Sequence, residues 1–360
     1  MTYYRTLDGL RGIGVLAVVL YHADILAMGW MGVQLFFVLS GFLITSILLA
    51  SKEKPALTYF GTFYWRRTLR IFPLYYGFLA LAGLAYMLTG HPTGTAAHMP
   101  YLATYTFNLD RALIQDPQDI FFRHLWSLSF EEQFYLVWPL LVWLLPRKGL
   151  QFVVLLLICV SPMIRFVLGM GGMFEDSPYW GPLTYCFPLG HLDAFAFGAA
   201  VVVFPAGTAK PSAGEWLGFA LGLFVLAGIG AWLIGIRETG SYLIPAFGYP
   251  IGSVQLFLHV WGYSLENFLF ATMVLFAVKG AAGHWLNRVF SAGWLVALGK
   301  ISYGVYVIHW PLVLAWKHFV PESAGWGLRL VSLVPVLAVV WCLAWLSRRY
   351  FEGWFLRFRG

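Results

Sequence analysis

Long apolar runs separated by short polar connections make up most of the chain. A helix needs about 20 mainly apolar residues to cross the hydrocarbon core of a bilayer. By this measure we expect ten membrane-spanning helices, at residues 10–28, 32–50, 71–89, 125–145, 149–168, 187–205, 215–235, 258–278, 294–314 and 326–346. The segment 98–110 is too short and too polar to span, so we expect a re-entrant or interfacial piece there. The pattern predicts an all-α fold, a polytopic transmembrane helical bundle of about ten helices.

The composition supports this interpretation. Of the 360 residues, 60% are hydrophobic and 11% are charged, whereas soluble domains have about 45–50% apolar and about 25% charged residues. This balance excludes a soluble globule, a secreted disulfide scaffold, a disordered chain and a soluble nucleic-acid binder. No stretch is long and polar enough for a separate soluble domain. We therefore expect residues 1–360 to form a single integral membrane domain, with no additional soluble domain.

The basic residues predict how the helices are oriented. If the N-terminus lies inside, most of the 23 Lys and Arg residues fall in the inner connections, as the positive-inside rule requires. Arg165 is among the few assigned to the outer side. With ten spans, both termini are cytoplasmic. The net charge of +7 is then explained without a nucleic-acid partner.

Two ionisable residues in the first predicted span are candidates for function. An ionisable group within a span is costly and by default marks a path or a site. Arg11 and His22 are eleven residues apart, so both leave a helix on the same face, about 16 Å apart along its axis. The structural alternative is an arginine that reaches the interface and a core histidine that is only hydrogen-bonded.

Four further polar residues lie near the depth of His22 in the predicted topology. They are Glu131, Asp193, His191 and His309. Histidines and carboxylates gathered in one layer could supply a general base and the group that orients it. The alternative is that Glu131 or Asp193 merely pairs with a buried cation.

A second candidate cluster lies at the inner boundary. Arg67 and Arg70 are three residues apart, so they share a helix face. With Arg66, Arg11 and Lys300 they could form a basic pocket that faces the cytoplasm. Guanidinium groups bind phosphates in bidentate fashion. The alternative is that these residues only set orientation and attract anionic membrane lipids.

No other motif points to a different chemistry. The three cysteines lie far apart and have no metal-ligand spacing, so no metal is predicted. The sequence contains no GxSxG elbow, no P-loop, no HExxH and no GxGxxG after a strand. The candidate chemistry therefore rests on the polar residues of the spans.

Five sequence blocks carry a resemblance to a known family. In chain order they are LDGLRGIGVLAVVLYH (7–22), VQLFFVLSGFLI (33–44), RRTLRIFPLYY (66–76), LWSLSFEEQFYLVWP (125–139) and GKISYGVYVIHWP (299–311). These blocks resemble the acyltransferase-3 family of integral membrane acyltransferases, many of which modify carbohydrates. The resemblance covers nearly the whole chain.

The resemblance implies about ten helices, a cytoplasmic acyl-CoA donor (most often acetyl-CoA) and an acceptor reached from the outer side. It also implies that Arg11, His22, Arg67, Arg70 and Glu131 are functional, and it favours a bacterial inner (cytoplasmic) membrane. Some relatives carry an additional extracytoplasmic hydrolase-like domain, which is not expected here. Two positions depart from the pattern, so neither is given a role. His191 stands where similar sequences often carry an arginine, and FEGW lacks a proline after Glu352.

These observations combine into one hypothesis of mechanism. Arg67 and Arg70, with Arg66 and Lys300, would hold the phosphates of the acyl-CoA donor, and Arg11 would guide its pantetheine arm. His22 would take the proton from a hydroxyl of a carbohydrate or glycolipid acceptor. Glu131 or Asp193 would orient His22, and His309 would belong to the same catalytic group. An acyl-enzyme intermediate is the alternative to direct transfer.

Two other functions fit the same residues. A transporter could use intramembrane histidines and carboxylates as a proton relay, although no pair of Gly/Pro-broken helices marks two inverted halves. An acyltransferase could also modify a small molecule on the cytoplasmic side. The sequence leaves the acceptor, the acyl group and the oligomeric state open.

Overall fold

The computed structural model describes residues 3–89, 95–113, 121–174, 180–204, 211–239, 246–250, 255–281, 283–321 and 323–359. Within these ranges every regular element is helical, which confirms the all-α prediction. Six helices are long and apolar enough to cross a membrane: Ala27–Ser51, Ala56–Ala85, Arg147–Met170, Ala213–Gly235, Leu258–Lys279 and Trp326–Arg359. They indicate an integral membrane protein. The number of ten spans and the orientation of the termini stay predictions.

The helices follow one another with short connections. The α-helices are α1 (Arg5–His22), α2 (Met31–Ser51), α3 (Ala56–Thr89), α4 (Thr95–Ala103), α5 (Phe107–Leu113), α6 (Trp126–Leu144), α7 (Arg147–Phe174), α8 (Trp180–Cys186), α9 (Leu192–Val203), α10 (Ala213–Thr239), α11 (Tyr263–Lys279), α12 (Trp285–Phe290), α13 (Gly293–Lys300), α14 (Ser302–Phe319), α15 (Trp326–Leu346) and α16 (Gly353–Leu356). Short 3-10 or π turns η1 (Ala27–Trp30), η2 (Arg123–Leu125), η3 (Pro188–His191), η5 (Gln255–Phe257), η6 (Leu258–Gly262), η7 (Ser347–Glu352) and η8 (Arg357–Arg359) extend or link them.

Several predicted spans differ from the helices observed, among them the first, in which α1 ends at His22 and does not continue to residue 28. The run 294–314 is two helices, α13 and α14, because Ile301 between them adopts φ −105° and ψ 7°, outside the helical region. The helix predicted at 71–89 begins at Ala56 instead, because its first turns are rich in aromatic and basic residues and so escape a search for apolar runs. The segment 98–110 contains the end of α4 and part of the short helix α5, and neither is long enough to span.

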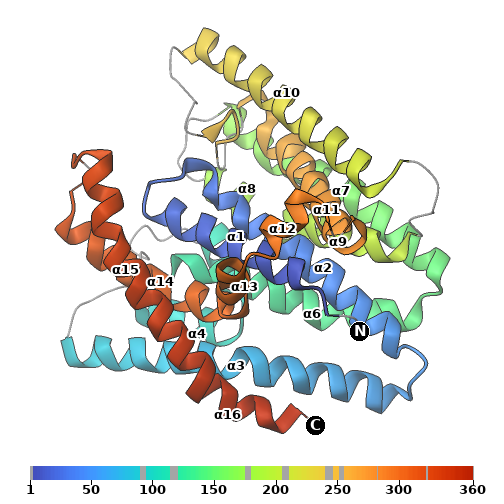
Figure 1. Cartoon of the computed structure of the whole chain (residues 1–360), viewed down its shortest axis with the longest axis horizontal. Coiled ribbons are helices and arrows are strands. Elements are labelled where there is room, and N and C mark those ends of the chain that lie inside the picture. Colours follow the sequence, from blue (N-terminus) through green and yellow to red (C-terminus); the bar gives the residue numbers. More distant parts are fainter. Residues whose placement is uncertain are drawn as a thin grey trace.

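Helix α1 lies in the middle of the bundle, between α2 on one side and α13 with α14 on the other (Figure 1). Its backbone approaches α13 closely at glycines. A Cβ atom on Gly12 would lie 2.3 Å from the carbonyl oxygen of Leu295, and one on Gly299 would lie 1.7 Å from that of Asp8. Small residues allow helices in membranes to pack at such distances. This packing holds the helix that carries Arg11 and His22 inside the bundle.

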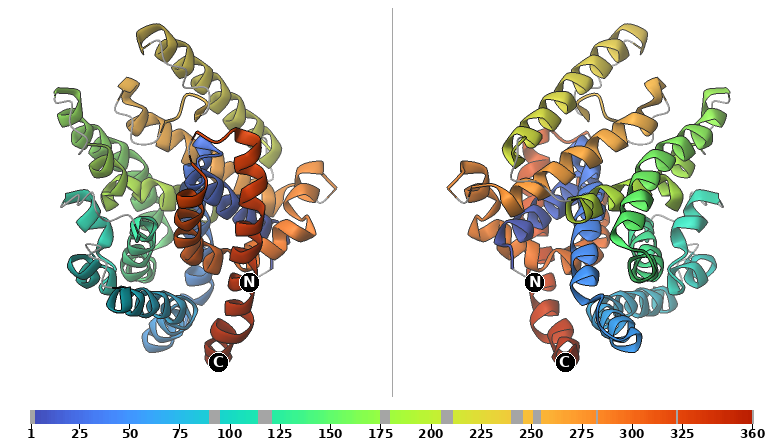
Figure 2. Two further views of the ribbon diagram at one scale, coloured as in Figure 1. Left: turned by 90° about the vertical axis from the view of Figure 1, so that its left-hand side faces the viewer. Right: turned by 90° about the vertical axis from the view of Figure 1, so that its right-hand side faces the viewer.

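The remaining helices surround this centre. Helix α2 packs along α9, while α10 stands at the edge of the bundle next to α11 (Figure 2). Helix α3 runs along another edge and is crossed by the chain that follows α15 (Figure 1). Helices α1, α2, α3, α6 and α14 thereby enclose a cavity.

Candidate active site

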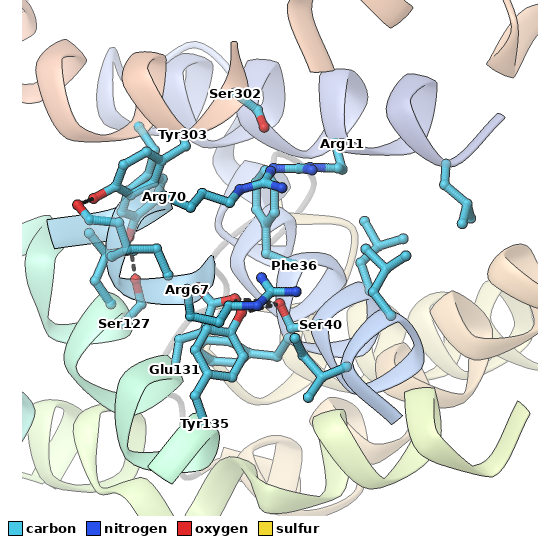
Figure 3. Close-up of a pocket in the computed structure, with 18 of the residues that line it drawn as sticks. Arg11, Phe36, Ser40, Arg67, Arg70, Ser127, Glu131, Tyr135, Ser302 and Tyr303 are labelled. Carbon is cyan, nitrogen blue, oxygen red and sulfur yellow. Dashed lines mark hydrogen bonds between the residues drawn. The ribbon is translucent and has the colours of Figure 1, made fainter. Parts of the chain in front are cut away.

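The cavity between these five helices has a volume of about 430 Å³. One part of its wall is apolar and includes Leu7, Leu39, Leu43, Ile44 and Ile47. The polar part is formed by Asp8, Arg11, Ser40, Arg67, Arg70, Ser127, Glu131, Glu132, Tyr135, Ser302, Tyr303 and Tyr306 (Figure 3). A long, partly apolar ligand with an anionic end would match these two surfaces.

Three arginines face the cavity from two helices. Arg11 comes from α1, and Arg67 and Arg70 come from one face of α3, as their spacing predicted. The guanidinium groups of Arg11 and Arg70 point toward one another (Figure 3). Among the ion pairs of the described residues, none involves these three arginines. Like charges that converge in a partly apolar cavity favour an anionic ligand such as a phosphate.

Glu131 belongs to a hydroxyl network on the wall of the same cavity. Its Oε1 accepts hydrogen bonds from the hydroxyl groups of Ser40 and Tyr135, which lie 3.1 Å from each other. The Arg67 guanidinium lies over the Tyr135 ring, 5.2 Å from its centroid. Glu131 thus holds two hydroxyl groups on the wall beside Arg67, and its hydrogen-bond partners do not include His22.

His22 instead pairs with His309. The two rings stack with their centroids 5.0 Å apart, and His22 Nδ1 lies 2.7 Å from His309 Nε2. On its other side, His309 Nδ1 lies 2.7 Å from the Tyr306 carbonyl oxygen. A carbonyl only accepts, so His309 Nδ1 carries the proton and His309 Nε2 accepts the proton of His22 Nδ1. This chain of hydrogen bonds leaves the lone pair of His22 Nε2 available as a base.

The histidine pair and the cavity share one wall. Tyr306 lines the cavity, and its ring also packs against His309 with a centroid distance of 5.7 Å. The Tyr306 hydroxyl donates to the His124 carbonyl oxygen at 2.6 Å and contacts Ser127. His309 is fully buried whereas His22 is partly exposed. Tyr306 therefore links the cavity wall to the histidine pair.

Asp193 lies in a separate buried network. Both of its carboxylate oxygens accept hydrogen bonds from Arg165, at 3.0 and 2.9 Å, and Ser264 donates a further one at 2.8 Å. Arg165 is fully buried within α7 and also donates to the carbonyl oxygens of Gly190 and Val260. Its assignment to the outer side of the membrane stays a prediction, but the side chain is enclosed by the protein and does not face solvent. An aspartate so engaged has no contact with His22, which corrects the expectation that it orients that ring.

Hydrogen bonds on both ring nitrogens also hold His191 in place within the bundle. Its Nε2 lies 2.6 Å from the Tyr185 carbonyl oxygen, so it donates there, and Nδ1 accepts from the Gln34 amide at 2.8 Å. Its ring stacks on Tyr263. The four polar residues of the predicted layer thus lie in four separate networks. Of the four, the structure brings His309 into contact with His22.

Two of the five residues predicted for the basic pocket do not line the cavity. Lys300 is exposed at the end of α13. Arg66 is exposed beside Arg67, and its Nε donates to the Arg359 carbonyl oxygen at 3.4 Å. Consecutive residues on a helix point about 100° apart, so Arg66 and Arg67 cannot share one face.

Sequence reasoning missed Ser40, Tyr135 and Tyr306 as residues of the site. A signal for Tyr135 was present, since it lies four residues after Glu131 and therefore on the same helix face. Ser40 interrupts an apolar run, which is weaker evidence. Among the described residues, no group of three or more His, Cys, Asp or Glu side chains could hold a metal ion.

Comparison with known proteins defines the class to which this bundle and its cavity belong. A family model described as an acyltransferase domain matches residues 4–346. The chain belongs to the acyltransferase-3 family, which confirms the resemblance of the five sequence blocks.

Two relatives illustrate the similarity. The chain is 31% identical over 330 residues to the peptidoglycan O-acetyltransferase OatA of Listeria monocytogenes, covering 86% of this chain and 49% of the relative. It is 27% identical over 334 residues to the O-acetyltransferase OatA of Staphylococcus aureus, covering 87% of this chain and 51% of the relative. The chain thus spans about half the length of these relatives. Among solved structures, none matches it significantly.

Proposed function

We propose that this protein is a membrane O-acetyltransferase that moves an acetyl group from cytoplasmic acetyl-CoA to a hydroxyl group of a cell-envelope saccharide. The observation that carries the proposal is the arginine-lined cavity next to the His22–His309 pair. Family membership and the O-acetyltransferase names of the relatives support the reaction. The name of the Listeria protein favours a peptidoglycan or similar polysaccharide, or a glycolipid precursor, as the acceptor.

The cavity fits the donor of this reaction. Arg67 and Arg70 would bind phosphates of acetyl-CoA, because guanidinium groups match phosphate oxygens in bidentate geometry. Arg11 would lie beside the diphosphate or the start of the pantetheine arm. The apolar wall of Leu39 and Leu43 would contact the arm itself. This arrangement agrees with ten spans and cytoplasmic termini in a bacterial inner membrane, with Arg11 nearer the inner side and His22 nearer the outer side.

His22 would act as the general base. Its free Nε2 takes the proton from the acceptor hydroxyl while the hydroxyl oxygen attacks the thioester carbonyl carbon. The carbon–sulfur bond then breaks, and the departing thiolate of CoA receives the proton from His22. His309 holds His22 in the required tautomer, in the way that a carboxylate does in other hydrolases and transferases. The thioester reaches His22 past Tyr306, so movement of this wall would be part of the cycle.

The donor assignment predicts a loss of binding when the α3 arginines are neutralised. In the double variant Arg67→Gln/Arg70→Gln, the affinity for acetyl-CoA should fall by about 100-fold, because two charge-assisted contacts to phosphate are lost. Calorimetry on the purified full chain measures this directly. Lys300→Gln is the matched control, since Lys300 lies outside the cavity lining and should bind acetyl-CoA normally.

Failure of the folded wild-type protein to bind acetyl-CoA would contradict the proposal. Equal binding by the wild type and the double variant would leave the proposed enzymatic activity in place. It would show that Arg67 and Arg70 do not bind the phosphates of acetyl-CoA.

The role of His309 predicts a difference between two substitutions. His309→Phe removes the acceptor for His22 Nδ1 and should lower kcat by about 10²-fold or more, the lower end of what general-base assistance contributes. His309→Gln retains an amide oxygen that accepts this proton and an amide N–H that donates to Tyr306, so it should recover much of kcat. The KM for acetyl-CoA should change little in either variant. Equal losses in both variants would show that His309 only fills space.

A further inference from the structure

The hydroxyl group of Ser302 is a buried polar group without a partner on the wall of the cavity. Ser302 is fully buried, and its Oγ has no hydrogen-bond partner among the described residues. In Figure 3 this oxygen points toward the side of the cavity where Arg11 and Arg70 lie. Buried hydroxyl groups in native proteins are nearly always hydrogen-bonded, because leaving one unpaired costs free energy. The exception at Ser302 points to a ligand that accepts its proton.

Ser302 is the first residue of α14, so the start of this helix also meets the cavity. Helix α14 is 18 residues long, and its N-cap residue is Ile301, whose side chain cannot cap the first turn. The N–H of Val305 donates to the Ile301 carbonyl oxygen at 3.0 Å and begins the intrahelical hydrogen bonds. The N–H groups before Val305 therefore lie at the helix end, where they and the helix dipole favour an anion.

On one side, the start of α14 lies next to α1. Gly299, three residues before Ser302, packs so closely on α1 that a Cβ atom there would overlap the Asp8 carbonyl oxygen. Asp8 and Arg11 are three residues apart, so they share a face of α1, and both line the cavity. The Asp8 carboxylate accepts a hydrogen bond from the Tyr3 hydroxyl at 2.7 Å. It does not take the proton of the Ser302 hydroxyl.

On the other side, the start of α14 is bonded to α3. The Tyr303 hydroxyl donates to the Ile71 carbonyl oxygen at 2.7 Å. Ile71 directly follows Arg70, whose guanidinium group points toward that of Arg11 (Figure 3). Contacts at neighbouring residues thus hold Ser302 between the two helices that carry these arginines.

One face of α14 leads from this start to the histidine pair. Ser302, Tyr306 and His309 are spaced by four and three residues, so they lie along the same helix face. Ser302 and Tyr306 line the cavity, and His309 contacts His22. Seven residues of helix rise by about 10 Å. A phosphate bound at Ser302 and a group that reacts at His22 therefore fit one ligand with a long arm between them.

We infer that Ser302 Oγ and the first turn of α14 bind the diphosphate of the acyl-CoA donor, between Arg11 and Arg70. The inference rests on the proposed function, and it deepens that function by assigning the donor a hydroxyl and a helix end in addition to the arginines. The Ser302 hydroxyl donates to a phosphate oxygen, and the pantetheine arm runs along α14 toward His309. A phosphate of an anionic lipid has the same chemistry and is the competing source of the ligand.

One substitution should have different effects on stability and on binding. Ser302→Ala removes a hydroxyl that has no partner among the described residues of the ligand-free protein, so the Tm of this form should stay the same or rise. The same change removes a hydrogen bond to a charged phosphate, so the affinity for acetyl-CoA should fall by about 10-fold or more. A hydroxyl with a structural role would instead lower the Tm of the ligand-free protein.

The test uses the full chain in dodecyl maltoside, with calorimetry for acetyl-CoA and displacement of acetyl-CoA by ADP. ADP carries a diphosphate on adenosine but no pantetheine arm, so Ser302→Ala should weaken the binding of both compounds by the same factor. Ser302→Asp places a negative charge beside the diphosphate and should lower both affinities further. Ser46→Ala is the matched control, because Ser46 donates to the Phe42 carbonyl oxygen within α2 and lies outside the cavity lining. It should bind both compounds as the wild type does.

Each alternative outcome has a separate meaning. If the folded wild type does not bind acetyl-CoA, the proposed function fails together with the inference. If Ser302→Ala or Ser302→Asp binds acetyl-CoA as well as the wild type does, the donor stands and the site at Ser302 is overturned. A loss for acetyl-CoA without a matching loss for ADP would assign the hydroxyl to the pantetheine arm and overturn the diphosphate site. An equal loss in Ser46→Ala, or a lower Tm of ligand-free Ser302→Ala, would also overturn it.

A lipid in place of the donor has its own signature. Phosphatidylglycerol added to the micelles should leave the affinity of the wild type for acetyl-CoA unchanged if the donor is the ligand of Ser302. If the added lipid weakens binding by the wild type and not by Ser302→Ala, a lipid phosphate occupies the site and the assignment to the donor is overturned.

Discussion

Replacing His22 by alanine is expected to lower the rate of acetyl transfer by about 10²–10⁴-fold, the range that general-base assistance contributes. The affinity for acetyl-CoA should stay within a few-fold of the wild type, because His22 is not among the residues that line the arginine cavity. The loss follows from the hydrogen-bond chain, in which His309 fixes the His22 Nδ1 proton and leaves Nε2 as the base.

Transfer is measured with labelled acetyl-CoA and a saccharide acceptor in reconstituted vesicles. Calorimetry on the same preparation measures donor binding. His318→Ala is the matched control, since His318 lies on the same helix as His309 but is exposed. Turnover close to that of the wild type in His22→Ala would exclude His22 as the base.

Replacing Asp193 by alanine is expected to destabilise the protein by about 3–5 kcal/mol, the usual result of removing one partner from a buried ion pair. The substitution would leave the Arg165 guanidinium buried without its carboxylate, although it keeps contacts to Ser264 and to backbone carbonyl oxygens. Thermal denaturation in detergent should show a lower Tm and a smaller yield of folded protein.

A second variant separates stability from catalysis at this position. The double substitution Arg165→Met/Asp193→Leu removes both charges and should recover much of the lost stability. Apolar residues of similar volume in place of a buried ion pair often leave the free energy of unfolding unchanged. Glu215→Ala, at an exposed site in the first turn of α10, is the control for removing a carboxylate. If Asp193→Ala were as stable as the wild type but inactive, Asp193 would regain the catalytic role that the sequence suggested.

The helical class and the shared face of Arg67 and Arg70 could be predicted because both depend on local periodicity. Apolar runs predict helices, and a separation of three residues predicts a common helix face. The same local reasoning placed Arg11 on the face that lines the cavity. It missed the break near Lys300, since α13 ends where its backbone meets α1, a contact between residues nearly three hundred positions apart.

The partners of the polar residues could not be predicted in the same way. The position of a residue along a span predicts its depth in the membrane but not its place within the membrane plane. Four residues of similar predicted depth therefore appeared to lie near His22, namely His309, Asp193, His191 and Glu131. The direction in which each helix turns its side chains depends on tertiary packing, and it places the four residues in four separate networks. Arg165 shows the same difficulty, because an arginine near the end of an apolar run looks peripheral until its buried carboxylate on another helix is known.

The separation of 287 residues between His22 and His309 has a consequence for biogenesis. Helix α1 leaves the ribosome well before α13 and α14, against which it packs. The first helix must therefore be held in the translocon or in lipid with its arginine and histidine still lacking the neighbours of the finished bundle. His22, the proposed base, meets His309 only when α14 is inserted. A chain whose synthesis has not reached α14 would thus lack the proposed catalytic pair.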